Sequence, residues 1–194
     1  MAAESTENDG YLTGQLLIAM PNMRDPRFAR SVIYLCAHNE DGAIGLVINR
    51  LIGSITFPDL LTQLDIDSEC GSDRSQPAVH FGGPVETERG FVLHSADYLQ
   101  DDSMAIDGSV ALTATVDIVR DIAEGGGPRE SILALGYAGW GPGQLDGEIQ
   151  ENAWLNVESD AGLVFDPDLD AKWDRAIAKL GIDAALLSSE AGRA

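Results

Sequence analysis

The sequence has few cations. It contains 12 Lys and Arg residues against 32 Asp and Glu residues, which gives a formal net charge of −20, and the acidic residues are spread along the chain. Affinity for nucleic acid comes largely from cations that displace condensed counterions, and anionic lipid attracts the same groups. We therefore expect no direct binding to DNA, to RNA or to a membrane.

Long apolar runs and paired cysteines are also lacking. No apolar stretch approaches the roughly 20 residues that a helix needs to span a bilayer. The first residues, MAAESTENDG, contain neither a basic nor an apolar segment, so we expect no signal peptide and assign residues 1–10 to a disordered acidic leader. The two cysteines, Cys36 in an apolar run and Cys70 in a polar one, show no sign of pairing. Reduced thiols predict a cytoplasmic protein.

Motifs of well-known enzyme classes are missing as well. The chain has no G-x-x-x-x-G-K-[ST] phosphate loop, no G-x-S-x-G nucleophile elbow, no H-E-x-x-H and no C-x-x-C. A dinucleotide fingerprint beginning at Gly139 would need glycine at position 144, where the chain has Gln144. We therefore predict no cofactor.

The hydrophobic patterns that are present predict one α+β domain, of an α/β/α-like kind, with a mixed sheet. Strands are expected in GQLLIAM, SVIYLCAH, GAIGLVINR, AVHFGGPV, GFVLHSA and SILALGYAGW, with the second and third forming a hairpin. Helices are expected in FPDLLTQLD, TATVDIVRDIAE, QLDGEIQENAW and DAKWDRAIAKLG. At 194 residues the chain is long enough for one substantial core and short for two.

Four residues have side chains that zinc prefers. Cys36 and His38 are two apart on a predicted strand and so are expected on one face, and His80 and His94 fall on later strands. Their scattered positions lack the local spacing of zinc sites, which favours no metal site. A lowered pKa at Cys36 would require contact with His38, and the alternative is a buried, inert thiol.

Glycine corners and strand ends carry the candidate ligand-binding residues. Backbone close to a ligand or to a neighbouring strand is expected where glycines cluster, and polar residues at strand ends can face the same space. A single site would gather these eight residues: Asn49, Gly82, Gly83, Pro84, His94, Trp140, Gln144 and Glu148. The alternative for each is structural, with Asn49 and His94 bonding loops and Glu148 pairing with a surface cation.

The stretch GYAGWGPGQLDGEI, followed by Trp154, resembles the signature of the bacterial YqgE/AlgH family. The segments LLIAMPNMRDPRFARSVIYLCAHNEDGAIGLVIN, GGPV, RGFVLH, GLVF and SSEAGRA resemble that family in order and spacing, so the likeness covers residues 11–194. The resemblance implies a single compact domain with a mixed, partly barrel-like sheet flanked by helices. It brings no reaction, and some members carry the label of transcriptional regulator.

Three functions follow as hypotheses. The first is a non-catalytic cytoplasmic accessory or regulatory protein that acts through a protein or ligand partner, because catalytic motifs are missing. The second is an enzyme or small-molecule-binding protein with a site at the glycine corners around His94 and Trp140. The third, direct transcriptional regulation, rests on the family label alone and conflicts with the net charge of −20. The oligomeric state is not predicted.

Overall fold

The computed structural model describes residues 10–67 and 76–187. The strands are β1 Gln15–Ala19, β2 Val32–Asn39, β3 Gly42–Val47, β4 Val79–Phe81, β5 Val85–Ser95, β6 Met104–Ala105, β7 Val110–Thr113, β8 Ser131–Trp140 and β9 Trp154–Glu158. The helices are α1 Phe57–Gln63, α2 Val116–Glu124, α3 Gln144–Gln150, α4 Ala161–Val164, α5 Leu169–Ala178 and the 3-10 turn Ala184–Leu187. The expected leader, Cys70 and the closing SSEAGRA fall outside the described residues, apart from Gly10.

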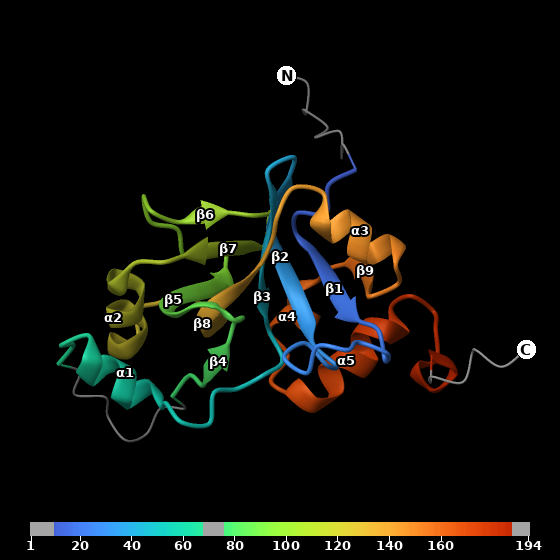
Figure 1. Cartoon of the computed structure of the whole chain (residues 1–194). Coiled ribbons are helices and arrows are strands. Elements are labelled where there is room, and N and C mark those ends of the chain that lie inside the picture. Colours follow the sequence, from blue (N-terminus) through green and yellow to red (C-terminus); the bar gives the residue numbers. More distant parts are fainter. Residues whose placement is uncertain (1–9, 68–75, 188–194) are drawn as a thin grey trace, which may run out of the picture.

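The strands form one curled, half-barrel sheet. Its order is β6-β7-β5-β8-β3-β2-β1-β9, and β4 pairs in parallel with β8 beside this path, whereas the other pairings are antiparallel. Figure 1 shows α1 and α2 beside β4, β5 and β8, whereas α4 and α5 lie beside β1 and β2. The predicted mixed, partly barrel-like sheet flanked by helices is confirmed, as is the single domain.

Most of the predicted elements form where the patterns place them. The β2–β3 hairpin pairs Asn39 with Gly42, and α1 begins with a capping box in which Thr56 and Asp59 satisfy each other's backbone N–H groups. Helix α2 ends at Gly125 in the left-handed conformation that favours glycine. The sheet and its helices enclose three apolar clusters, one of which lies under α3 and includes Trp140 and Trp154.

The helix predicted for QLDGEIQENAW is too long. Helix α3 ends at Gln150, the chain turns at Asn152 with a φ of 59°, and Trp154 begins β9. Pairing with β1 joins Trp154 to Ala19 and Leu155 to Ile18. A tertiary strand partner thus overrides the local helical pattern. In the described residues, no helix has the length and apolar character needed to cross a membrane.

Lys172 is buried in the core. Its side chain is fully buried, and its Nζ donates to the carbonyl oxygens of Val164 at 2.8 Å and Ile48 at 3.1 Å. No carboxylate within the described residues forms an ion pair with it. Burial lowers the pKa of Lys172 from 10.5 to about 8.

The buried amine makes stability rise with pH. Below pH 8 Lys172 is protonated in both states, and its desolvation cost is fully present. Between pH 8 and 10.5 the unfolded chain binds the extra proton, so unfolding becomes harder as pH rises. We expect the unfolding free energy of the wild type minus that of Lys172→Met to increase by roughly 2–3 kcal/mol from pH 7 to pH 10. Urea unfolding at both pH values measures it, and a constant difference would contradict a depressed pKa.

Candidate functional site

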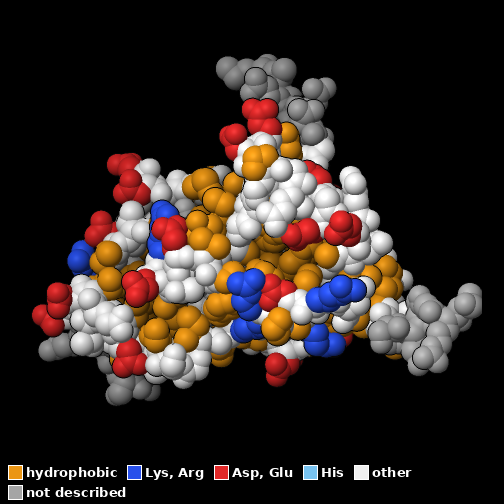
Figure 2. Space-filling view, viewed as in Figure 1, with side chains coloured by type: hydrophobic (Ala, Val, Ile, Leu, Met, Phe, Trp, Pro, Cys, Tyr) orange, Lys and Arg blue, Asp and Glu red, His pale blue; other side chains and the backbone are white. Residues whose placement is uncertain are grey.

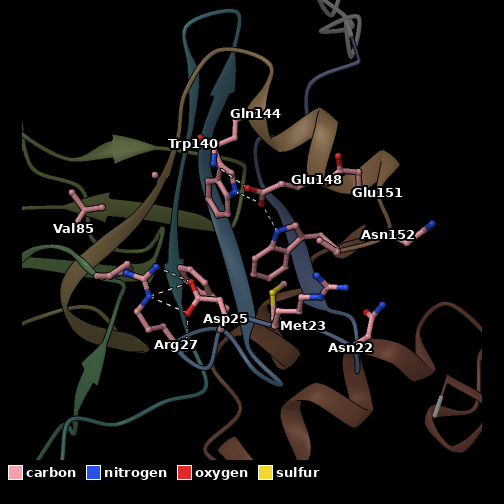
Figure 3. Close-up of a pocket in the computed structure, with 16 residues that line it drawn as sticks. Asn22, Met23, Asp25, Arg27, Val85, Trp140, Gln144, Glu148, Glu151 and Asn152 are labelled. Atoms are coloured by element: carbon pink, nitrogen blue, oxygen red, sulfur yellow. Dashed lines mark hydrogen bonds and ion pairs between the residues drawn. The ribbon is translucent and has the colours of Figure 1, made fainter. Parts of the chain in front are cut away.

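A cleft of about 710 Å³ lies between α3 and the loop 20–31 that follows β1 (Figure 3). We call it the Trp–Glu cleft. Sixteen residues line it: Asn22, Met23, Arg24, Asp25, Arg27, Phe28, Pro84, Val85, Gly139, Trp140, Gln144, Glu148, Glu151, Asn152, Ala153 and Trp154. These residues come from distant parts of the sequence, so the cleft exists only in the folded chain.

Glu148 fixes one wall of the cleft. Its Oε2 accepts a hydrogen bond from the indole Nε1 of Trp140 and another from that of Trp154, both at 2.9 Å, and its Oε1 accepts one from Gln144 Nε2 at 3.0 Å. Figure 3 shows the two indole nitrogens converging on this carboxylate. All three donors are neutral, and no cation within the described residues forms an ion pair with Glu148. The cleft therefore holds a positioned, half-buried negative charge.

Aromatic rings pack around this carboxylate. The rings of Trp140 and Trp154 meet edge to face, with centroids 6.0 Å apart and planes at 81°, and Phe28 meets Trp154 at 5.7 Å and 71°. Trp140 and Trp154 are buried within the cluster under α3 and line the cleft with their remaining surface. A buried indole N–H needs an acceptor, and Glu148 supplies it to both.

The loop 20–31 forms the opposite wall. Asp25 and Arg27 form a two-pronged ion pair, with Nη2 and Oδ2 2.7 Å apart, and this hydrogen bonding lowers the pKa of Asp25. Arg24 is exposed and forms no hydrogen bond or ion pair with any described residue. Arg50 holds the loop from outside the cleft by donating to the carbonyl oxygens of Arg27 and Ala29.

The two walls differ in charge. Figure 2 shows apolar surface between acidic side chains over α3 and basic side chains over the loop that follows β1. Glu148 and Glu151 belong to the acidic wall, and Arg24 and Arg27 belong to the basic one. On the loop wall Asp25 pairs with Arg27, so Arg24 supplies the unmatched positive charge that faces the acidic wall.

The structure divides the eight predicted site residues. Pro84, Trp140, Gln144 and Glu148 line the Trp–Glu cleft, and their role in binding stays a prediction. Gln144 and Glu148 share a face of α3, as their spacing predicts. Asn49, Gly82, Gly83 and His94 do not line it. The surface cation expected to pair with Glu148 is absent from the described residues, because the two indoles and Gln144 take its place.

Asn49 fastens the loop without facing the cleft. Its Oδ1 accepts from the Val32 N–H, and its Nδ2 donates to the Arg30 carbonyl oxygen, both at 2.9 Å. Together with Arg50, it joins the end of the loop to the strand end that follows β3. Asn49 therefore positions the basic wall of the cleft indirectly.

Gly82 and Gly83 allow close approach of two backbones. A Cβ on Gly82 would lie 2.3 Å from the Gly136 carbonyl oxygen, and one on Gly83 would lie 2.0 Å from the Tyr137 carbonyl carbon. Both glycines are buried against β8. Of the two interpretations of this corner, contact with a neighbouring strand is the one that the geometry shows.

His94 is fully buried in β5. Its Nε2 lies 2.8 Å from Thr113 Oγ1, its Nδ1 lies 3.0 Å from the Ser95 carbonyl oxygen, and Tyr98 packs edge to face on its ring. Burial lowers the pKa of His94. Both ring nitrogens have protein partners and the residue lies away from the cleft lining, so His94 and Trp140 do not share this cleft.

The expectation that Cys36 and His38 share a strand face is wrong. Cys36 packs with Tyr34 in the core, and a β-bulge between Leu35 and Ala37 changes the alternation of the residues that follow it. His38 Nδ1 instead accepts from the Leu12 N–H, and its Nε2 lies 3.7 Å from Asp146 of α3. Burial raises the pKa of Cys36 to about 12, which makes this thiol inert at neutral pH.

The four proposed zinc ligands are not brought together. Each histidine of the set has another hydrogen-bonding partner, and His80 Nδ1 lies 3.3 Å from the Ala78 carbonyl oxygen. Within residues 10–67 and 76–187, no group of three or more His, Cys, Asp or Glu side chains is arranged to hold a metal ion.

Sequence reasoning missed the whole loop wall. The segment MPNMRDPRF was part of the family resemblance but contributed no candidate residue, although it contains two prolines, two arginines and a phenylalanine between two predicted strands. Nothing in the local pattern shows that Arg24 and Phe28 lie across from α3. That arrangement depends on β9 pairing with β1, which also places Trp154 beside Glu148.

Comparison with known proteins agrees with this fold and its motifs. The family model described as AlgH-like matches residues 16–185. A UPF0301 protein of Rhodopseudomonas palustris strain HaA2 is 57% identical over 194 residues, covering 97% of this chain and 89% of the relative. A UPF0301 protein of Beijerinckia indica is 57% identical over 201 residues, covering 100% of this chain and 98% of the relative.

Two solved structures resemble the chain. The solution structure of the AlgH protein from Pseudomonas aeruginosa has a TM-score of 0.75 at 40% identity and covers all of both chains. The crystal structure of protein DIP2367 from Corynebacterium diphtheriae has a TM-score of 0.72 at 20% identity, covers 92% of each chain, and is similar in fold. From its motifs, its fold and these relatives, the chain belongs to the AlgH-like family of bacterial proteins.

Proposed function

We propose that this chain is a non-catalytic accessory or regulatory protein of the bacterial cytoplasm that recognises a protein partner through the Trp–Glu cleft. The observation that carries the proposal is the chemistry of the cleft lining. Among the described lining residues there is no Ser, Thr, Cys, Lys, His or Tyr, so the cleft offers no hydroxyl, thiol, amine or imidazole as a nucleophile or base. Of its carboxylates, Asp25 is held in the two-pronged ion pair with Arg27, and Glu148 already accepts three hydrogen bonds.

The lining suits recognition instead. Half of the lining residues are polar or charged, and the others include two Trp, one Phe and one Met. Aromatic residues, Met and Arg, with a polar rim around them, are typical of protein–protein interfaces. The carboxylate of Glu148 is already oriented by three hydrogen bonds, so little ordering remains to be done on binding. The free Cys36 thiol is compatible with a reducing compartment.

The other two hypotheses have less support. A site centred on both His94 and Trp140 is not supported, because His94 is buried and hydrogen-bonded outside the cleft. Direct transcriptional regulation still conflicts with the net charge of −20. Turnover of any substrate that is abolished by replacing Glu148 would overturn the non-catalytic proposal.

Site-specific photocrosslinking in the native bacterium tests the proposal. A photoreactive amino acid replaces Glu151 or Asn22, which are exposed and lie on the two walls, and matched controls carry it at Asp117 or Glu124 on α2. We expect the same discrete protein adduct from both cleft positions and none from α2. Adducts that are equally frequent from α2, or none from the cleft, would show that the partner surface lies elsewhere.

A further inference from the structure

We propose that the Trp–Glu cleft receives an arginine-bearing peptide segment of the partner, with the guanidinium at Glu148 and a nearby acidic side chain at Arg24. The inference rests on the proposed function and names the chemistry of the segment that the same cleft would recognise.

Glu148 keeps unused hydrogen-bonding capacity. A carboxylate has about four lone-pair sites. Two sites on Oε2 are taken by the indoles of Trp140 and Trp154, and one on Oε1 is taken by Gln144. One acceptor site on Oε1 is therefore left for a donor from outside, and a charged donor would also neutralise a carboxylate that has no ion-pair partner among the described residues.

Aromatic side chains surround that carboxylate. Trp140 and Trp154 keep only 7% and 2% of their surface exposed, so a cation at Glu148 reaches a narrow, largely apolar space. A guanidinium is planar and more weakly hydrated than an ammonium, so it loses less hydration free energy there than lysine does. This chain already places a guanidinium over an aromatic ring twice: the guanidinium carbon of Arg30 lies 4.2 Å from the ring centroid of Trp173, outside the cleft, and that of Arg27 lies 5.8 Å from the ring centroid of Phe28, within it. Arginine is thus the cation that fits this wall.

The opposite wall carries an unmatched positive charge. Asp25 and Arg27 neutralise each other in their ion pair, whereas Arg24 is exposed and has no partner within the described residues. The unmatched charges of the cleft are therefore negative on α3 and positive on the loop. A segment with an arginine and a carboxylate a short distance apart complements both, and a polyanion or a polycation complements only one.

The test uses acetylated, amidated pentapeptides and the indole N–H signals of ¹⁵N-labelled protein. The chain has three tryptophans, and Trp173 donates to the Ala19 carbonyl oxygen inside the core, so its signal is an internal reference. The probes are Ala-Arg-Ala-Glu-Ala, the same peptide with citrulline for arginine, the same peptide with glutamine for glutamate, and free arginine. Citrulline keeps the shape of arginine and removes its charge.

We expect the first peptide to shift the Trp140 and Trp154 signals and to leave the Trp173 signal unchanged. Citrulline should weaken binding at least 10-fold, and the Glu148→Gln variant should remove that difference. Glutamine in place of glutamate should weaken binding about 3-fold in the wild type and have no effect in Arg24→Ala. The spectrum of each free variant shows whether it is folded.

Three results would overturn the inference: no shift at 10 mM peptide, equal binding of the citrulline peptide, or equal binding of free arginine, which would make the ligand a small molecule. Because the titration needs no cellular partner, these results leave the photocrosslinking outcome standing. A missing adduct, conversely, would remove the proposed function without altering the peptide affinities.

Discussion

Replacing Glu148 with alanine is expected to lower the free energy of unfolding by about 2–3 kcal/mol. The change leaves the indole N–H groups of Trp140 and Trp154 without their acceptor, and both side chains are more than nine-tenths buried. Each unsatisfied buried donor costs about 1–3 kcal/mol. Water that enters the cleft can accept from the two indole N–H groups, so the expected loss is smaller than the sum of the two costs. Urea unfolding monitored by tryptophan fluorescence measures it.

Two controls separate the hydrogen bonds from loss of side-chain bulk and charge. Glu148→Gln keeps a carbonyl oxygen for the indoles and is expected to cost less than about 1 kcal/mol. Glu151→Ala truncates a neighbouring, exposed glutamate in the same cleft and is expected to change stability by no more than about 0.5 kcal/mol. Equal stability of Glu148→Ala and Glu151→Ala would contradict the proposed organisation of the cleft wall.

Gly83→Ala is expected to destabilise the fold by about 3 kcal/mol or more. A Cβ at this position would lie 2.0 Å from the Tyr137 carbonyl carbon, 2.2 Å from its oxygen and 2.3 Å from the Ala138 nitrogen. These are backbone atoms of β8, so relief requires the corner to move away from the strand, which is costly in a packed core. Thermal and urea unfolding measure the loss.

Gly53→Ala is the matched control for this substitution. A Cβ on Gly53 meets nothing within 4 Å, and its φ is not positive, so we expect a change within about 0.5 kcal/mol. An unfolding midpoint for Gly83→Ala equal to that of Gly53→Ala would mean that the corner does not press on β8. The other interpretation of the glycine corner, close approach of its backbone to a ligand, would then be favoured.

Local patterns in the sequence were sufficient for most of the fold. The β2–β3 hairpin and the helices α1 and α5 were predicted because each depends on residues close together in the chain. The failures came where partners are distant. Trp154 was assigned to a helix because the pattern before it is helical, and only pairing with Ala19 makes it the start of a strand.

The candidate site divides in the same way. Gln144 and Glu148 were placed on one face because helix geometry fixes their spacing, and Trp140 was placed beside them by the glycine corner. His94 was included because it ends an apolar strand, but a threonine 19 residues away satisfies its ring. The bulge after Leu35 separated Cys36 from His38, and no local signal of the hairpin predicts it.

The most direct measurement is the dissociation constant of the crosslinked partner, once purified, for the wild type, Glu148→Gln and Glu124→Gln by isothermal titration calorimetry. Both variants remove one negative charge, the first from the cleft and the second from an exposed position on α2. We predict at least 10-fold weaker binding for Glu148→Gln, about 1.4 kcal/mol, and unchanged binding for Glu124→Gln. Unchanged binding for Glu148→Gln would contradict recognition through the Trp–Glu cleft.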